Sequence, residues 1–192
     1  MTWWLKWRRK DPYPPDTSSP PLPTGDHPRL LITATNLPTI QARLSTGGVW
    51  AADFQTWVDW ADGWYPFALT DTHVNLPFLA ADYAFLWLTH PVVGATYGHT
   101  RAQYGALARD LLLLLPTVEP IVGNYNWYGL PLGYDWIHSL LSTSDKTTLV
   151  TMMKTVDNYD LLPPESAFDS QVTVGRAQAM LSALAFAEDG ID

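Results

Sequence analysis

The sequence predicts an all-α fold built from helical hairpins. Apolar residues recur at helical spacing almost everywhere after residue 27, and no segment indicates a strand-rich region. Segments that are apolar on every face alternate with amphipathic segments, and the alternation recurs about every 40 residues, which is the scale of helical repeats. This pattern is typical of either a superhelical stack or an (α/α) toroid, in which buried helices line an inner ring and amphipathic helices form the outer wall.

The first 26 of the 192 residues are expected to be disordered. They combine a start rich in Trp and basic residues, MTWWLKWRRK, with a Pro-rich linker, which is typical of an extended polyproline-like segment. The start does not resemble a secretory signal, because its basic residues follow the apolar ones. The folded domain is therefore expected to span residues 27–192.

Two helices are expected at the beginning of this domain. Thr35 or Asn36 can cap a short helix that tolerates Pro38 in its first turn and ends at Gly47 and Gly48. A second helix follows, and its apolar face is formed by Trp50, Phe54, Trp57, Val58 and Ala61.

Two pairs of helices come next, each with a buried and an amphipathic member. Residues 76–90 are apolar nearly all round, whereas the helix that follows them has one apolar stripe beside charged positions. Residues 131–141 are again apolar on two faces. Ser142 and Asp145 form the capping-box pattern that begins a second amphipathic helix. A last buried helix is expected over residues 174–188.

The composition argues against several classes of function. The formal net charge is −8 and no basic run lies inside the folded part, so binding to nucleic acid is not expected. The chain has no cysteine, its histidines lack metal-ligand spacing and no phosphate loop is present, so no metal or other cofactor is expected. The run LLLLL at 111–115 is far shorter than the roughly 20 residues of a membrane span, and no stable membrane insertion is expected.

The aromatic content is high, with 10 Trp, 9 Tyr and 6 Phe. It indicates either large cores between helices or flat platforms for sugar rings or a partner surface. A loop just before residue 129 offers aromatic faces and amides that suit a saccharide, with ordinary loop packing as the alternative. The members of this loop are Asn124, Tyr125, Asn126, Trp127 and Tyr128.

Charged and titratable residues supply further candidates. Asp82 and Asp135 lie inside the two most apolar helices, either as structural acceptors for backbone or Tyr groups or as an acid/base pair. His138 is a weak catalytic candidate, for which packing is the alternative. Positive charge for an anionic substrate is offered by Arg29, Arg101, Arg109 and Arg176, of which Arg176 is the best placed.

Three stretches resemble heparinase II/III-like and alginate-lyase-like polysaccharide lyases. They are HPRLLITATNLPTIQARL at 27–44, GLPLGYDWIHSLLSTSDKTTL at 129–149 and, more weakly, AQAMLSALAFAEDGID at 177–192. The resemblance implies that the domain is about the first half of an (α/α) toroid, which in the family is followed by β-sandwich domains. It also implies eliminative cleavage of an acidic, uronate-containing polysaccharide or oligosaccharide, and a location outside the cell or in the periplasm.

The resemblance also concerns individual residues. Tyr134, in the Tyr-Asp-Trp core of the family's inner helix, joins Arg176 and the aromatic loop as an expected substrate-binding residue. Where family members often have Asn and His, this chain has Gln171 as the nearest catalytic candidate and no His. Several of the family's catalytic residues come from parts of the toroid beyond residue 192.

The chain is therefore expected to be incomplete alone, so that a missing C-terminal portion or self-association covers its inner helices. Two alternatives stay open. One is a non-catalytic helical module that binds carbohydrate or protein, and the other is a fragment of an (α/α) toroid glycoside hydrolase that uses Asp82 and Asp135.

Overall fold

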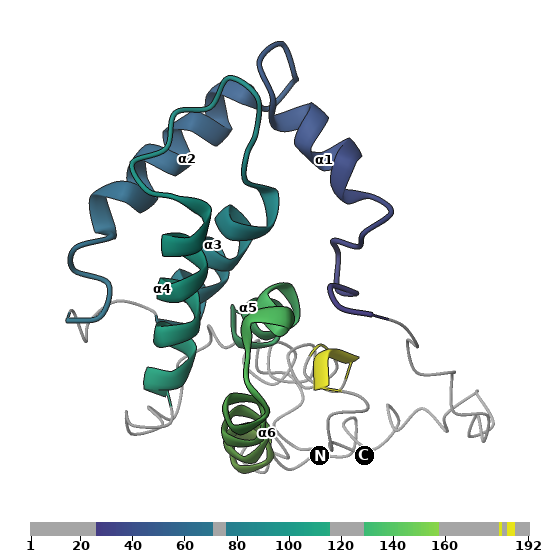
Figure 1. Ribbon diagram of the computed structural model, residues 1–192, viewed down its shortest axis with the longest axis vertical. Helices are drawn as coiled ribbons and strands as arrows, with labels where there is room; N and C mark the ends of the chain where they lie inside the picture. The colour runs from purple at the N-terminus through teal and green to yellow at the C-terminus, as the bar shows by residue number, and fades with distance from the viewer. Residues whose placement is uncertain (1–25, 71–75, 116–128, 158–180, 182–183, 187–192) are drawn as a thin grey trace, which may run out of the picture.

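Every regular element in the part of the chain that the structure describes is a helix. The computed structural model describes residues 26–70, 76–115, 129–157, 181 and 184–186, and no strand occurs among them (Figure 1). The predicted all-α class is confirmed for these residues, whereas the predicted start and most of the predicted last helix lie outside them. The elements are α1 (Leu37–Leu44), α2 (Ala51–Trp64), α3 (Leu76–Thr89), α4 (Arg101–Leu114), α5 (Gly129–Ile137), the 3-10 helix η3 (His138–Leu140) and α6 (Thr143–Asp157).

Local signals mark the beginnings of three helices. α1 begins after Asn36 with the expected Pro38 in its first turn, but the Asn36 side chain accepts the N–H of Thr33 and caps no N–H of α1. α6 begins with the expected capping box, in which the Ser142 N–H donates to Asp145 Oδ2 at 3.0 Å and the Asp145 N–H donates to Ser142 Oγ at 3.1 Å. α4 begins with a second capping box, formed by Thr100 and Gln103.

α3 is the most deeply buried of the long helices. Ten of its 14 residues are buried, as expected for a helix that is apolar on every face. α2 buries only one stripe, formed by Phe54, Val58 and Ala61. The expectation that Trp50 belongs to this stripe is wrong, because Trp50 precedes the first helical turn as the N-cap and its side chain is 54% exposed.

Tyrosines fill the space between the helices. Tyr83 on α3, Tyr104 on α4 and Tyr134 on α5 have no exposed surface. The Tyr83 hydroxyl donates to the carbonyl of Ala61, the Tyr104 hydroxyl donates to Asp62, and burial raises the pKa of both phenols. Core packing therefore accounts for a large part of the aromatic content.

The main helix packing is that of α3 against α4 and α5. α1 and α2 lie at one end of the view, and α5 lies next to α3 with α6 beyond it (Figure 1). Gly129 allows α5 to approach the first turn of α3, since a Cβ there would lie 1.9 Å from the carbonyl oxygen of Pro77. The two most apolar helices, α3 and α5, are thus neighbours, and the amphipathic helices α4 and α6 also touch.

Candidate functional site

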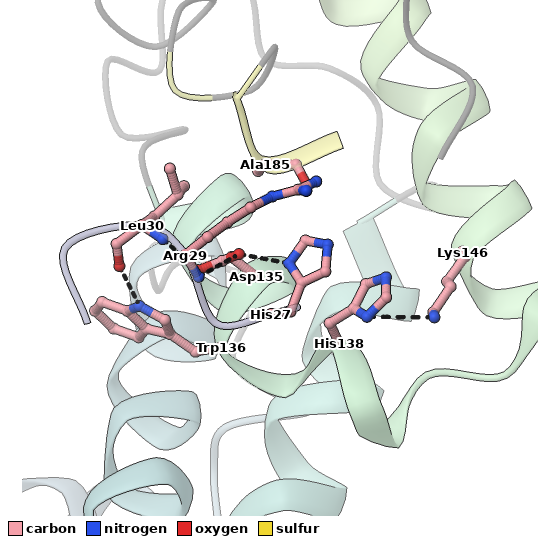
Figure 2. A network of polar contacts seen from close by, with 8 residues as sticks. All are labelled: His27, Arg29, Leu30, Asp135, Trp136, His138, Lys146 and Ala185. Carbon is pink, nitrogen blue, oxygen red and sulfur yellow. Dashed lines mark hydrogen bonds and ion pairs between the residues drawn. The ribbon is translucent and has the colours of Figure 1, made fainter. Parts of the chain in front are cut away.

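Asp135 on α5 lies at the centre of a buried network of hydrogen bonds (Figure 2). The residue is 1% exposed. Its carboxylate accepts hydrogen bonds from the backbone N–H of Arg29 at 2.9 Å and of Leu30 at 2.8 Å, and the Nδ1 atom of His27 lies 2.5 Å from Oδ1. A carboxylate without such partners would be costly to bury. Asp135 is therefore a structural acceptor for the backbone of the segment that precedes α1.

The same network ties together parts of the chain that are far apart in sequence. The indole N–H of Trp136 donates to the carbonyl of Leu30 at 3.0 Å, and the Nη2 atom of Arg29 donates to the carbonyl of Ala185 at 3.1 Å. Segment 26–32 is thereby connected both to α5 and to the helical residues 184–186.

Two imidazole rings stack at the edge of the network. The ring centroids of His27 and His138 are 3.6 Å apart and the ring planes differ by 19°. The Nζ atom of Lys146 lies 3.4 Å from His138 Nδ1, and an ammonium can only donate, so a neutral His138 carries its proton on Nε2. The carboxylate of Asp135 has the opposite effect on His27, because Nδ1 must donate and a neutral ring then has its lone pair on Nε2.

Asp135 and Lys146 contact the Nδ1 atoms of the two adjacent rings (Figure 2), and these contacts favour opposite tautomers of the neutral imidazoles. The side chain of His27 is 9% exposed, so this pair lies at the border of the core. The residues termed here the His27 cluster are His27, Arg29, Leu30, Asp135, Trp136, His138, Lys146 and Ala185.

Tyr134 supports the cluster from the core. It is fully buried, its ring stacks on Phe186 with centroids 4.0 Å apart, and it meets the ring of His138 edge-on at 5.4 Å. Tyr134 was expected to bind substrate, but in this structure its side chain has no surface exposed to a ligand. Its position suits orientation of the His138 ring.

Asp82 on α3 has an environment different from that of Asp135. Burial raises the pKa of Asp82 to about 7, partly opposed by a hydrogen bond from the side chain of Trp57. No hydrogen bond in the described residues links it to Asp135. The two carboxylates therefore bind separate partners: Asp82 accepts from Trp57, and Asp135 accepts from segment 26–32.

A second candidate site is an open groove along α4. It has a volume of about 490 Å³ and lies between α4, the end of α3 and η3. The Nε atom of Arg101 donates to the carbonyl of Trp87 at 2.9 Å, and the guanidinium lies 4.8 Å from the centroid of the Trp87 ring. The residues termed here the Arg101 groove are Trp87, Arg101, Ala102, Gly105, Ala106, Arg109 and Leu140.

The other arginine of this groove is paired with carboxylates. Arg109 donates to both oxygens of Asp145, at 2.9 and 3.1 Å, and its Nη1 atom lies 3.3 Å from Asp110. The hydrogen bonds from Arg109 hold the pKa of Asp145 below its usual value. The positive charge of the groove is therefore concentrated at its Arg101 end.

The remaining candidate residues lie outside the part of the chain that the structure describes. They are Asn124, Tyr125, Asn126, Trp127, Tyr128, Gln171 and Arg176. Within the described ranges, no group of three His, Cys, Asp or Glu side chains could hold a metal ion. Also within these ranges, no helix combines the length and apolar character needed to cross a bilayer.

The structure adds His27, Lys146 and Trp87 to the residues considered from sequence. His27 is the first residue of the HPRL motif at 27–30, so this motif is the sequence feature that could have identified it. The pairing of Lys146 with His138 joins η3 to α6 and has no local sequence signal. Comparison with family models, curated proteins and solved structures finds no match to this chain.

Proposed function

We propose that this helical domain belongs to an enzyme that cleaves uronate-containing polysaccharides by β-elimination. The observation that carries the proposal is the stacked pair His27 and His138, whose partners Asp135 and Lys146 favour opposite proton positions. A second support is that the three stretches resembling polysaccharide lyases meet in this cluster. The pairing of α3 with α5, and of α4 with α6, suits the inner and outer layers of an (α/α) toroid.

The two imidazoles match the two proton transfers of an elimination. In the proposed step His27 Nε2 takes the proton from C5 of the uronate, and the electrons of the C5–H bond form the C4–C5 double bond. The C4–O glycosidic bond breaks at the same time. The leaving oxygen receives the proton of His138 Nε2, so the step needs no other reactant.

Lys146 and Asp135 act as positioning residues in this proposal. The ammonium of Lys146 lies 3.4 Å from His138 Nδ1, on a different edge of the ring from the Nε2 atom that donates the proton, and so favours the tautomer of His138 that the step needs. Asp135 acts through His27 as a positioning residue, since it sets the tautomer and the ring orientation.

The proposal is tested by incubating the protein with alginate, heparan sulfate and hyaluronan. The readout is the ultraviolet absorbance of the 4,5-unsaturated uronate that only an elimination produces. The resemblance implies a domain that is incomplete alone, but both proton-transfer groups of the proposed step lie within this chain, so we expect product from at least one of these polymers. The rate should be at least about 100-fold lower for both His27→Gln and His138→Gln, because each removes a proton-transfer group.

A matched control is His99→Gln. The ring of His99 also stacks on an aromatic neighbour, Tyr65, at 3.6 Å between centroids, but it is not part of the His27 cluster. The control should keep the wild-type rate within about twofold. Absence of product from all three polymers, or equal rates for the His27 and His99 variants, would refute the proposal.

A second candidate function is binding of an acidic glycan without cleavage. It is favoured by the Arg101 groove, which is open and has its charge at one end. Glycan binding with no unsaturated product would select this function. Hydrolysis by Asp82 and Asp135 has less support, because Asp135 uses both oxygens to hold backbone amides and His27.

A further inference from the structure

We infer that the Arg101 groove is a carboxylate-binding site for an acidic oligosaccharide, separate from the His27 cluster. The choice of a uronate as the acid rests on the proposed function. The groove itself indicates a ligand that has a carboxylate and an apolar ring face. The Arg101 donors and the distribution of charge suit the carboxylate, and the apolar floor suits the ring.

The position of the Arg101 side chain is explained by the backbone at the end of α3. The carbonyl of Trp87 would normally accept the N–H of residue 91, but residue 91 is Pro and has no N–H. Arg101 Nε supplies the missing donor at 2.9 Å, and the guanidinium stacks near the Trp87 ring. One nitrogen and one face of the guanidinium thus fix the side chain in place.

The two terminal nitrogens of Arg101 remain for a ligand. Within the described residues neither of them makes a hydrogen bond, and the side chain is exposed. Among these residues the indole N–H of Trp87 also has no hydrogen-bond partner, although the same ring lies against the groove floor. A planar guanidinium with two outward nitrogens matches a carboxylate, which can accept both in parallel.

The rest of the groove suits the carbon-rich face of a sugar ring. Ala102, Gly105 and Ala106 lie on one face of α4 and form a floor without long side chains, and Leu140 forms a wall. A Cβ at position 105 would lie 2.6 Å from both Leu140 Cδ1 and Trp87 Cδ1, so Gly105 is required for the close approach of these two walls. This apolar channel extends from the Arg101 end to Arg109.

The charges favour one orientation of the ligand. Arg109 is already compensated by Asp145 and Asp110, so a second carboxylate gains little at that end. Arg101 has no carboxylate partner among the described residues. One acid group is therefore held at Arg101 while the ring lies along the floor toward Arg109.

The experiment is a calorimetric titration of the full chain with an alginate tetrasaccharide, and with cellotetraose as the uncharged comparison. We expect the alginate tetrasaccharide to bind and cellotetraose to bind at least about tenfold more weakly, since the charge-assisted hydrogen bonds are missing. Arg101→Gln should weaken binding of the acid about tenfold or more.

A second variant covers the case in which Arg101→Gln disturbs α3. Ala106→Glu places a carboxylate on the exposed floor of the groove and should weaken binding at least about tenfold by repulsion. Ala52→Glu adds the same charge to an exposed position of α2 and should leave the affinity within about twofold. Equal affinity of the Ala106 and Ala52 variants, no binding of the acid, or equal binding of cellotetraose would overturn the inference.

Product absorbance in the same mixtures separates this inference from the proposed function. Binding that depends on Arg101, without unsaturated product, would refute the lyase proposal and support carboxylate binding in the Arg101 groove. Unsaturated product, together with binding that does not change in the Arg101 and Ala106 variants, would support the lyase proposal and refute binding in the groove.

Discussion

The His27 cluster and the Arg101 groove each contain an arginine and a tryptophan, but these side chains use their hydrogen-bond donors differently. In the cluster, Arg29 donates to the Ala185 carbonyl and Trp136 donates to the Leu30 carbonyl. In the groove, Arg101 uses only Nε on the protein, and among the described residues the Trp87 N–H has no hydrogen-bond partner. The cluster is buried around a carboxylate, whereas the groove is open.

The difference shows how burial decides the use of a polar group. A buried donor or acceptor without a partner is costly, so the Asp135 carboxylate and the Trp136 indole N–H are hydrogen-bonded within the protein, which fixes their geometry. An exposed donor is paired with water at little cost and remains ready for a ligand. The cluster is therefore suited to holding two imidazoles in place, and the groove is suited to binding.

The largest expected effect is that of Asp135→Ala on stability. The variant leaves the amides of Arg29 and Leu30 and the Nδ1 atom of His27 without their acceptor, and we expect a loss of about 3–5 kcal/mol in the free energy of unfolding. Urea denaturation measures it. The control Asp59→Ala, at an exposed position of α2, should change stability by less than about 1 kcal/mol. A similar small change for Asp135→Ala would remove the contrast between the two sites.

The next effect concerns Asp82 and pH. Its folded pKa of about 7 lies above the ordinary value of 3.8, so the native state binds the proton more tightly and stability falls as pH rises from about 4 to about 7. Asp82→Asn keeps an acceptor for Trp57 and removes this penalty. We expect it to stabilise the protein above pH 7 by up to about 4 kcal/mol, with little change below pH 4.

Urea denaturation at several pH values provides the test. The wild type should lose stability through the stated window, while the Asp82→Asn variant should have a flatter profile there. Identical slopes for the two proteins would mean that Asp82 does not prefer the protonated form in the native state.

A smaller effect is expected for Arg101→Gln on stability. The side chain is exposed and loses one hydrogen bond to the Trp87 carbonyl, which corresponds to less than about 1 kcal/mol. Thermal or urea unfolding measures this change. A loss comparable to that of Asp135→Ala would show that Arg101 is a structural residue, and would weaken the assignment of the groove as a binding site.

The smallest effect is a shift in the titration of His90. Burial lowers the pKa of His90 and the charge of Arg101 lowers it further. Arg101→Gln should therefore raise the pKa of His90, as should a carboxylate bound at Arg101. The proton NMR titration of the imidazole ring reports this directly, and an unchanged pKa would show that the charge of Arg101 is not felt there.

Much of the helical pattern could be predicted because it depends on local periodicity. The all-round apolar character of α3 and the Ser142–Asp145 capping box both lie within short stretches of sequence, and the structure confirms both. Trp50 was misassigned because the first helical turn begins one residue later, and a shift of one position turns a side chain by about 100° around a helix.

The candidate sites could be predicted only in part. Asp135 was identifiable as a carboxylate in an apolar helix, and the alternative of a structural acceptor agrees with its backbone hydrogen bonds. The pairing of His27 with His138 could not be predicted, because 110 intervening residues separate them and only the packing of segment 26–32 on α5 brings the rings together. The Arg101 groove depends in the same way on the approach of η3 to α4.

The central claim is that Asp135 and Lys146 hold His27 and His138 as opposite tautomers, and imidazole nitrogen-15 NMR tests it most directly. At a pH where both rings are neutral, we predict the proton on Nδ1 of His27 and on Nε2 of His138, with His99 as an internal reference. Asp135→Asn should weaken the preference of His27 and leave that of His138 unchanged. The same tautomer in both rings of the wild type would contradict the account.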